Sequence, residues 1–528
     1  MKIINPVLPG FHPDPSICKA EGEFFIASST FQWLPGVRFH RSKDLVNWKM
    51  AGYALTRKSQ LDLIGVEDNA GVWAPCLSYS NGIFFLIFTN VIAWTGAYKD
   101  AHNYLVTSNS IEGSWSEPVY INSSGFDPSL FHDDDGRMWF LNMLWDHRMG
   151  QNPFGGILLQ EYDFEKKQLI GSVKNIFKGT ELGLVEGPHL YKKDGWYYLL
   201  TAEGGTSWNH AATIARSKNI DGPYEVMPHN PLCTSRYNDT LELQRAGHGS
   251  LVETENGQWY LAHLCGRPVM PKRKCILGRE TALQALHWPK DSWPSLAHGS
   301  NEPAVEVKAP GLSPFPFSSD SKNSYGMDDF TTSTLNPEFN SLRDHVDKSW
   351  LSLDARPGFL RITGRESLYS KHHQSLVARR ITNLNTGASC STEFYPETFS
   401  QMAGLIFYYD TTNHHYLRIT KNSSGERTVG IITCDGGEHR EYPDYETVLP
   451  KEGEIFLKGV MTGSTLQFYY GTIKEQWIKL GTPLDATVIS DENKAEVKFT
   501  GAFAGMCVQD LKGTRLFADF DWFLIETV

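Results

Sequence analysis

Five residues whose types suit catalysis or ligand binding recur at nearly even spacing along the first half of the chain. They are Asp14, Trp73, Asp127, Glu186 and His248, which lie 59, 54, 59 and 62 residues apart. No two of them are close in sequence, so only the fold could bring them together. Three carboxyl groups, an indole and an imidazole would then share one cavity.

Three carboxyl groups in a small cavity suit acid–base chemistry. Like charges that lie close together raise the pKa of at least one of the groups. Glycoside hydrolysis requires a protonated carboxyl group beside an ionised one, and a separation of about 6.5–9.5 Å between them admits a water and predicts inversion. A single aspartate before a proline is more often a turn residue. Three acids at the same phase of a repeat favour the catalytic interpretation.

The other two residues of the set have several interpretations. Trp73 could be a core residue or a platform on which a sugar ring stacks. His248 could be a hydrogen-bonded structural residue, a sugar contact or a metal ligand. The sequence leaves these alternatives open.

Each of the five residues opens a repeat of the same kind. Small residues or proline follow, then an apolar stretch, a glycine turn and an aromatic stretch, as in DPSICKAEGEFFIAS and EGPHLYKKDGWYYLLTA. A second motif that ends in an aromatic residue occurs in three copies, at 42–48, 108–115 and 217–224. Each unit therefore holds about four strands. Five units predict a five-bladed β-propeller, whereas a sandwich gives no reason for a period near 58 residues.

The second half of the chain lacks this period. Residues 309–324 are rich in proline and serine, which predicts a linker. Alternating strands such as GLIFYYD and RLFADFDWFLI follow. The sequence thus predicts an all-β chain, with a propeller over residues 1–308, a linker over 309–324 and an antiparallel β-sandwich over 325–528.

The composition excludes some classes of function. Lys and Arg number 49 against 60 Asp and Glu, a net charge of −11, which suits a neutral substrate and not a nucleic acid. No apolar run reaches the roughly 20 residues of a membrane helix. The start, MKIINPVLPG, has no signal-peptide features, so we expect a cytoplasmic protein. The eight cysteines are scattered without a CxxC pair, which predicts free thiols.

The sequence around the repeated residues resembles glycoside hydrolase family 43, and in particular its β-xylosidases. The runs NPVLPGFHPDPSIC, GVWAPCLSY, GFDPSLF and LVEGPHLY carry the resemblance, which covers essentially the whole chain. It implies a five-bladed propeller followed by a sandwich, and hydrolysis with inversion. It also implies that Asp14 is the general base, that Glu186 is the general acid, and that Asp127 orients this acid and raises its pKa.

The resemblance further implies a sugar pocket that is closed on one side. Phe503 would reach over from the sandwich to close it, Arg279 would donate hydrogen bonds to sugar hydroxyls, and His248 would lie beneath the site. The implied substrate-binding residues are Phe31, Trp73, Trp145, His248, Arg279 and Phe503.

The resemblance also has implications for cofactors and for assembly. Some members of the family hold a calcium ion near the propeller axis. The sequence offers no dedicated carboxylate cage and no zinc spacing, so we assign no metal ligand and expect no required cofactor, although a calcium ion near the axis is compatible with it. Relatives often assemble through the sandwich, which implies a homo-oligomer.

Together these features predict an exo-acting β-1,4-xylosidase. It would release xylose from the non-reducing ends of xylooligosaccharides, with α-L-arabinofuranosidase side activity. One alternative is an arabinan- or arabinoside-degrading hydrolase of the same family. The other is a non-catalytic sugar-binding propeller, which would not need three acids in register.

Overall fold

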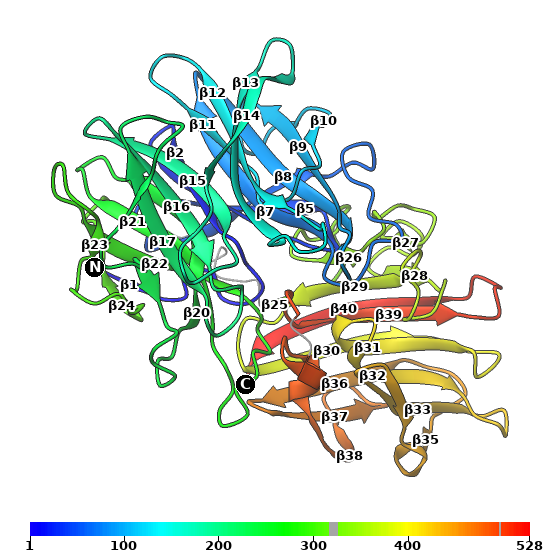
Figure 1. The fold of residues 1–528 in the computed structure, drawn as a ribbon. Coiled ribbons are helices and arrows are strands. Elements are labelled where there is room, and N and C mark those ends of the chain that lie inside the picture. Colours follow the sequence, from blue (N-terminus) through cyan, green and yellow to red (C-terminus); the bar gives the residue numbers. More distant parts are fainter. Residues whose placement is uncertain (316–325, 496–497) are drawn as a thin grey trace.

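Two β-domains lie side by side in the computed structural model, which describes residues 1–315, 326–495 and 498–528 (Figure 1). Within these ranges the helical elements are the 3-10 turns η2 (Pro443–Tyr445), η3 (Ala486–Ile489) and η4 (Asn493–Ala495). None of the helical elements in the described ranges has the length and hydropathy to cross a membrane. The all-β prediction is confirmed.

The first domain is a five-bladed β-propeller, as the repeat predicts. Each blade is an antiparallel sheet of four strands that follow one another along the chain, and blade four carries the extra strand β19 (Cys233–Thr234). The blades are formed by β2 (Ser16–Ala20), β3 (Glu23–Ser28), β5 (Gly36–Ser42) and β6 (Lys49–Leu55); β7 (Gly71–Ser80), β8 (Ile83–Ala93), β9 (Asp100–Ser108) and β10 (Val119–Asn122); β11 (Ser129–His132), β12 (Met138–Trp145), β13 (Phe154–Asp163) and β14 (Gln168–Phe177); β15 (Glu186–Lys193), β16 (Trp196–Glu203), β17 (Ala211–Ser217) and β18 (Glu225–Val226); and β20 (Gln244–Glu253), β21 (Trp259–Gly266), β22 (Glu280–His287) and β23 (Ser295–Leu296).

A separate pair of strands closes the propeller ring. The N-terminal strand β1 (Lys2–Ile4) pairs antiparallel with β24 (Glu306–Lys308), and Asn5 continues the connection to blade five. Its side-chain amide donates to the Leu283 carbonyl at 2.7 Å, and its side-chain oxygen accepts from the Leu283 N–H at 2.8 Å. The first residues of the chain are thereby fastened to the last blade.

The inner strand of every blade has a residue in the left-handed backbone region within it or just before it. Such residues turn the chain sharply and re-aim the neighbouring side chains. Four of them precede a proline and the fifth precedes Gly249. In blades two and four the residue that opens the repeat, Trp73 or Glu186, lies just before the left-handed residue. The left-handed residues are Asp14 (φ 51°), Ala74 (36°), Asp127 (54°), Gly187 (56°) and His248 (40°).

The second domain is a β-sandwich of two antiparallel sheets, in agreement with the sequence. Its core of buried Leu, Ile, Val and Phe side chains lies between the sheets. One sheet contains β25 (Gly326–Asp328), β27 (Leu351–Ser352), β28 (Leu360–Thr363), β30 (Asn385–Glu393), β36 (Ile455–Thr462), β37 (Thr465–Gly471), β38 (Ile478–Asp485) and β40 (Phe517–Thr527). The other contains β4 (Trp33–Leu34), β26 (Asn340–Leu342), β29 (Ser375–Arg380), β31 (Gln401–Asp410), β32 (Asn413–Lys421), β33 (Arg427–Asp435), β34 (Glu438–Glu441), β35 (Thr447–Val448) and β39 (Phe503–Asp510).

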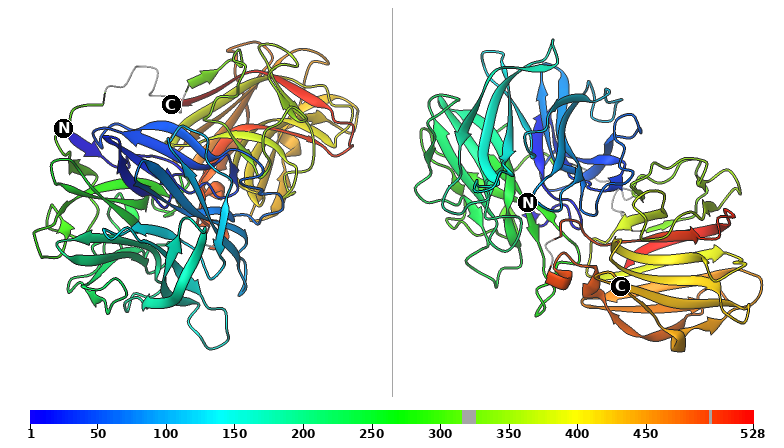
Figure 2. Two further views of the ribbon diagram at one scale, coloured as in Figure 1. Left: turned by 90° about the horizontal axis from the view of Figure 1, so that it is seen from above. Right: turned by 45° about the vertical axis from the view of Figure 1, so that its right-hand side comes forward.

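One strand of the sandwich comes from the propeller. Strand β4 leaves blade one and pairs with β26, so the second sheet runs from the sandwich into the propeller. Figure 2 shows the two domains in contact from two further directions. The stretch before the sandwich also packs on the propeller, since the backbone N–H of Phe315 donates to Asp44 at 2.8 Å. The rest of the predicted linker, residues 316–324, lies outside the described residues.

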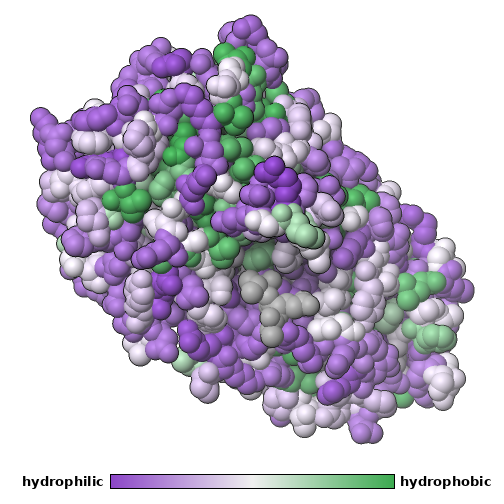
Figure 3. Space-filling view, viewed as in Figure 1, coloured by the Kyte–Doolittle hydropathy of each residue, from purple (hydrophilic) through white to green (hydrophobic). Residues whose placement is uncertain are grey.

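Polar side chains cover most of the face shown in Figure 3, and apolar residues gather mainly over the propeller.

Candidate active site

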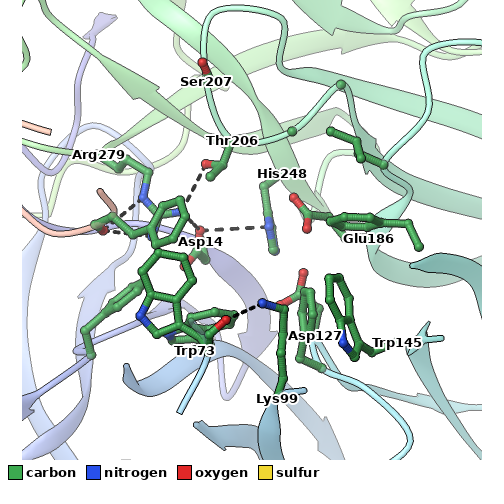
Figure 4. A pocket seen from close by; sticks show the side chains of 18 residues that line it. Asp14, Trp73, Lys99, Asp127, Trp145, Glu186, Thr206, Ser207, His248 and Arg279 are labelled. Atoms are coloured by element: carbon green, nitrogen blue, oxygen red, sulfur yellow. Dashed lines mark hydrogen bonds and ion pairs between the residues drawn. The ribbon is translucent and has the colours of Figure 1, made fainter. Parts of the chain in front are cut away.

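All five residues that open the repeats line one cavity at the axis of the propeller. The cavity has a volume of about 400 Å³. Figure 4 shows Asp14, Asp127 and Glu186 around it, with His248 between Asp14 and Glu186 in this view. The convergence follows from the propeller, which places the start of each inner strand at the same end of the axis.

Asp14 is held as a carboxylate by two donors. Its Oδ2 accepts from the Ser29 hydroxyl at 2.7 Å, and its Oδ1 accepts from Arg279 Nη1 at 2.8 Å. Ser29 Oγ in turn accepts from the Ala74 N–H at 2.7 Å, which joins blade one to blade two. A carboxyl group that an arginine and a serine hold in place suits a general base.

Glu186 and Asp127 both have raised pKa values, which favours their protonated forms. Burial raises the pKa of Glu186 well above its usual range, and the charges of Asp127 and Asp14 raise it further. Burial and the Asp14 charge raise the pKa of Asp127 to about 8. Asp127 Oδ2 also accepts from the Gly187 N–H at 3.1 Å, which fixes Asp127 beside the acid. The pair can hold a proton at neutral pH beside the ionised Asp14.

His248 lies under the cavity because Gly187 makes room for it. A Cβ on Gly187 would lie 3.1 Å from the His248 ring, and the φ of 56° there also favours glycine. His248 Nδ1 is 3.9 Å from Asp14 Oδ1. Burial lowers the pKa of His248, so the imidazole is a neutral neighbour of the base.

Arg279 holds the site together, a role that the sequence did not indicate. It donates through Nη1 to Asp14 and to Thr206 Oγ1 (3.2 Å), and through Nε and Nη2 to the Phe499 carbonyl at 3.2 and 2.9 Å. Of its five N–H groups, these contacts with described residues leave one for a ligand. The predicted hydrogen bond from Arg279 to a sugar hydroxyl would use this remaining N–H group.

Aromatic side chains form the walls of the cavity. Phe31, Trp73 and Trp145 all line it, as predicted, and the Trp73 indole donates to the Asn69 carbonyl at 2.9 Å. Aromatic faces of this kind pack well against the C–H faces of a sugar ring. Four further aromatic residues line the cavity and were not predicted: Trp94, Phe126, Phe154 and Phe499.

The placement of Phe503 differs from the prediction. Phe503 is fully buried, stacks on Trp33 with ring centroids 3.9 Å apart, and does not line the cavity. It is the first residue of β39, where strand pairing directs its ring into the domain interface. Phe499, four residues earlier and outside the strand, supplies the wall from the sandwich. No repeat or motif in the sequence distinguishes the two phenylalanines.

Lys99 also lines the cavity, and the sequence did not indicate it. Its Nζ lies 4.3 Å from the centre of the Trp145 ring and donates to the Trp94 carbonyl at 2.6 Å. Burial lowers its pKa. Lys99 lies between β8 and β9, outside the repeated motifs, so the search for repeats could not detect it.

The described residues do not fit a calcium cage built from protein side chains. Burial, and next the neighbouring His248, lower the pKa of His189 and of His210, so the titratable groups around His248 on this side are imidazoles and not oxygen ligands. Calcium takes six to eight oxygen ligands. No group of three or more His, Cys, Asp or Glu residues in the described ranges is placed to hold a metal. We assign no chemical step to a metal.

Comparison with known proteins matches both domains. The family model described as "Glycosyl hydrolases family 43" matches residues 3–294, and "Beta xylosidase C-terminal Concanavalin A-like domain" matches residues 327–526. The chain is 46% identical to "Xylan 1,3-beta-xylosidase" of Vibrio sp, covering 99% of this chain and 98% of the relative. It is 47% identical to "Xylosidase/arabinosidase 43B" of Humicola insolens, over 100% and 98% of the two chains. The crystal structure of xylan beta-1,4-xylosidase from Bacillus halodurans C-125 is similar, with 52% identity, a TM-score of 0.97, and coverage of 99% of this chain and 100% of that one.

Proposed function

This chain belongs to glycosyl hydrolase family 43, and we propose that it is an exo-acting β-1,4-xylosidase that removes xylose from the non-reducing ends of xylooligosaccharides. The observation that carries the proposal is the asymmetry of the three carboxyl groups. Asp14 is an ion-paired carboxylate, while burial raises the pKa of Glu186 and of Asp127 in the same cavity. Such opposed states are typical of a catalytic acid and base.

The proposed reaction is a single displacement with inversion. Asp14 takes a proton from a water whose oxygen attacks the anomeric carbon. The bond to the leaving oxygen breaks as Glu186 donates its proton to that oxygen, and α-xylose leaves the enzyme. Asp127 acts through Glu186, because its carboxyl lies beside that acid and its charge disfavours the ionised form.

The shape of the cavity supports action on chain ends. Phe499 closes the side that faces the sandwich, and Phe31 and Trp73 form the adjoining wall. An enzyme that cuts within a chain needs a cleft open at both ends. A cavity walled on this side suits a terminal sugar instead.

Two alternatives concern the substrate. One similar protein carries the name of a 1,3-β-xylosidase, which makes a 1,3-linked xyloside the first alternative substrate. Another carries the name of a xylosidase/arabinosidase, which supports the side activity on α-L-arabinofuranosides. A non-catalytic sugar-binding propeller is disfavoured, because binding alone gives no reason to bury three carboxyl groups together. The cytoplasmic location and the homo-oligomer stay predictions.

The decisive experiment follows the anomeric proton signals of 1,4-xylobiose during its first minutes with the enzyme. We expect α-xylose to appear before β-xylose. The same assay on 1,3-xylobiose and on an aryl α-L-arabinofuranoside serves as the comparison. Initial release of β-xylose would contradict inversion, and turnover of 1,3-xylobiose or the arabinoside without turnover of 1,4-xylobiose would contradict the proposed substrate.

A further inference from the structure

A short part of the sandwich reaches the catalytic cavity of the propeller. We call residues 491–495 and 498–500 the crossing segment, since they lie between η3 and β39 and contact both domains. Phe499, the wall residue, belongs to it. The N–H of Phe499 donates to Asn69 Oδ1 at 2.9 Å, and its carbonyl accepts from Arg279. Any shift of this segment would therefore move a wall of the cavity and a partner of Arg279.

One phenol fastens both ends of the crossing segment. Tyr409, which is fully buried in β31, donates through its hydroxyl to Asp491 Oδ1 at 2.6 Å. The same hydroxyl oxygen accepts from the N–H of Thr500 at 3.1 Å. The two contacts hold residues 491 and 500 to one point of the sandwich.

One guanidinium fastens the start of the crossing segment to the propeller. Arg245, which is 1% exposed, donates from Nη1 to Asp491 Oδ2 at 2.6 Å and from Nη2 to Glu492 Oε1. The other Glu492 oxygen accepts from the Cys275 N–H at 2.7 Å, and the Asp491 N–H donates to the Cys275 carbonyl at 3.2 Å. A buried carboxyl group, that of Asp491, and a partly buried one, that of Glu492, thus bind one buried guanidinium.

Arg245 also contacts a residue that lies next to the cavity lining, although Arg245 itself does not line the cavity. Its guanidinium lies 4.9 Å from the centre of the Trp208 ring, and Trp208 directly follows the lining residues Thr206 and Ser207. Its carbonyl accepts from His210 Nδ1 at 3.2 Å. His248 lies three residues further along the same strand.

We propose that Arg245, Asp491 and Tyr409 are positioning residues, which fix Phe499 and, through its carbonyl, orient Arg279 on the base Asp14. None of the three lines the cavity. The link from Tyr409 to the base runs through Thr500, Phe499 and Arg279. The inference rests on the proposed glycosidase function.

The test compares two tyrosines of the same sheet. Tyr409→Phe keeps the ring in the core and removes the hydroxyl that joins Asp491 to Thr500. Tyr416→Phe is the matched control, because Tyr416 is also fully buried and its hydroxyl donates at 2.8 Å to the Cys507 carbonyl, away from the crossing segment. We expect Tyr409→Phe to lower kcat/KM on xylobiose by about 10- to 100-fold, the scale of a misplaced catalytic geometry. The kcat/KM of Tyr416→Phe on xylobiose should stay within about twofold of the wild-type value, because no catalytic contact moves.

The division between KM and kcat separates positioning from general damage. A displaced Phe499 weakens the sugar wall and raises KM, and a displaced Arg279 lowers kcat. Partial unfolding would lower only the active fraction and leave KM unchanged. Asp491→Asn is a second variant, and in combination with Tyr409→Phe it should cost less than the product of the two single losses, since both act through one contact.

Hydrogen exchange gives a readout that does not require activity. The backbone amides of Phe499 and Thr500 should exchange faster in Tyr409→Phe than in wild type. In Tyr416→Phe they should exchange at the wild-type rate. Equal kinetics and equal exchange in the two variants would overturn the inference. A wild-type enzyme that hydrolyses no xyloside or arabinoside would instead refute the proposed function, and the exchange measurement would still decide whether Tyr409 fixes the segment.

Discussion

At the scale of single residues, the environments of three similar side chains give them different roles. Asp14 accepts hydrogen bonds from a serine and an arginine. Burial raises the pKa of Glu186, and the charges of Asp127 and Asp14 add to the effect. The role of each carboxyl group therefore depends on burial and on its neighbours, and not on the residue type.

This difference predicts how Asp127 sets the pH dependence. Asp127→Asn removes a negative charge beside Glu186, while its amide oxygen can still accept from the Gly187 N–H. The pKa of Glu186 should fall, although burial still holds it above the usual range. Since the acid must be protonated, activity is lost as the pH rises through this pKa, so the alkaline limb of kcat/KM on xylobiose should move to lower pH. At pH values above this limb, the kcat/KM of the variant should fall on the order of 100-fold or more, because the general acid is then ionised.

An activated substrate supplies the control for this prediction. An aryl xyloside whose leaving group departs without a proton does not need the acid. Its alkaline limb should be nearly the same in wild type and in Asp127→Asn. An unchanged limb on xylobiose would show that Asp127 does not raise the pKa of Glu186.

At the scale of structural elements, glycines determine how closely the strands that carry the site approach each other. Gly71 begins β7, two residues before Trp73, and has a φ of 93°. A Cβ at Gly71 would lie 2.2 Å from the Phe31 carbonyl oxygen, which accepts from the Val72 N–H. This contact places Phe31 beside Trp73 in the cavity wall.

Two alanine substitutions separate backbone strain from this close approach. Gly82, in the turn between β7 and β8, also has a positive φ of 79°, but a Cβ there would meet nothing within 4 Å. Gly82→Ala should cost about 1–2 kcal/mol of stability from strain alone. Gly71→Ala should cost about 1–3 kcal/mol more, because Phe31 must move, and its KM for xylobiose should rise. Thermal unfolding and initial rates measure both effects, and equal unfolding temperatures would contradict the argument.

The sequence predicts the elements well where a repeat describes them. The period of glycine turns and aromatic stretches predicted five blades, and the phase of the repeat placed Asp14, Asp127 and Glu186 in one cavity. It could not separate Phe499 from Phe503, because that depends on where β39 begins. It could not detect Lys99, Thr206 or Arg245, because their positions depend on loops and on contacts between the two domains.

At the scale of the whole molecule, ion pairs between residues far apart in sequence join the two domains beside the active site. Arg343 of the sandwich donates from Nη2 to Asp68 Oδ1 of the propeller at 2.5 Å and from Nε to the Val66 carbonyl at 2.8 Å. The hydroxyl of Thr411 donates to the other Asp68 oxygen. Asp68 directly precedes Asn69, which binds the Phe499 N–H. The contact that joins the domains thus continues into the wall of the cavity.

This arrangement predicts an acid-sensitive domain contact. Burial alone would raise the pKa of Asp68, but the Arg343 guanidinium and the hydrogen bonds from Thr411 and Arg343 outweigh it, so the pKa lies below its ordinary value of 3.8. A carboxyl group whose folded pKa is depressed stabilises the fold above the unfolded pKa and loses this effect as the pH falls through the folded one. At pH 7, Asp68→Asn should therefore destabilise the protein by about 3–5 kcal/mol, because it leaves Arg343 buried without its counter-charge. The difference from wild type should shrink below pH 3.8.

A neighbouring carboxylate distinguishes this contact from an ordinary surface charge. Asp62 pairs with Lys58 at 3.7 Å, and its side chain is 51% exposed. Asp62→Asn should change stability by less than about 1 kcal/mol at any pH, and KM should stay the same. Asp68→Asn should also raise KM, because Asn69 and Phe499 follow the displaced segment. If the two variants unfold at the same temperature at pH 7 and bind xylobiose equally well, the Asp68–Arg343 pair does not join the sandwich to the active site, and the wall formed by Phe499 must be held by the crossing segment alone.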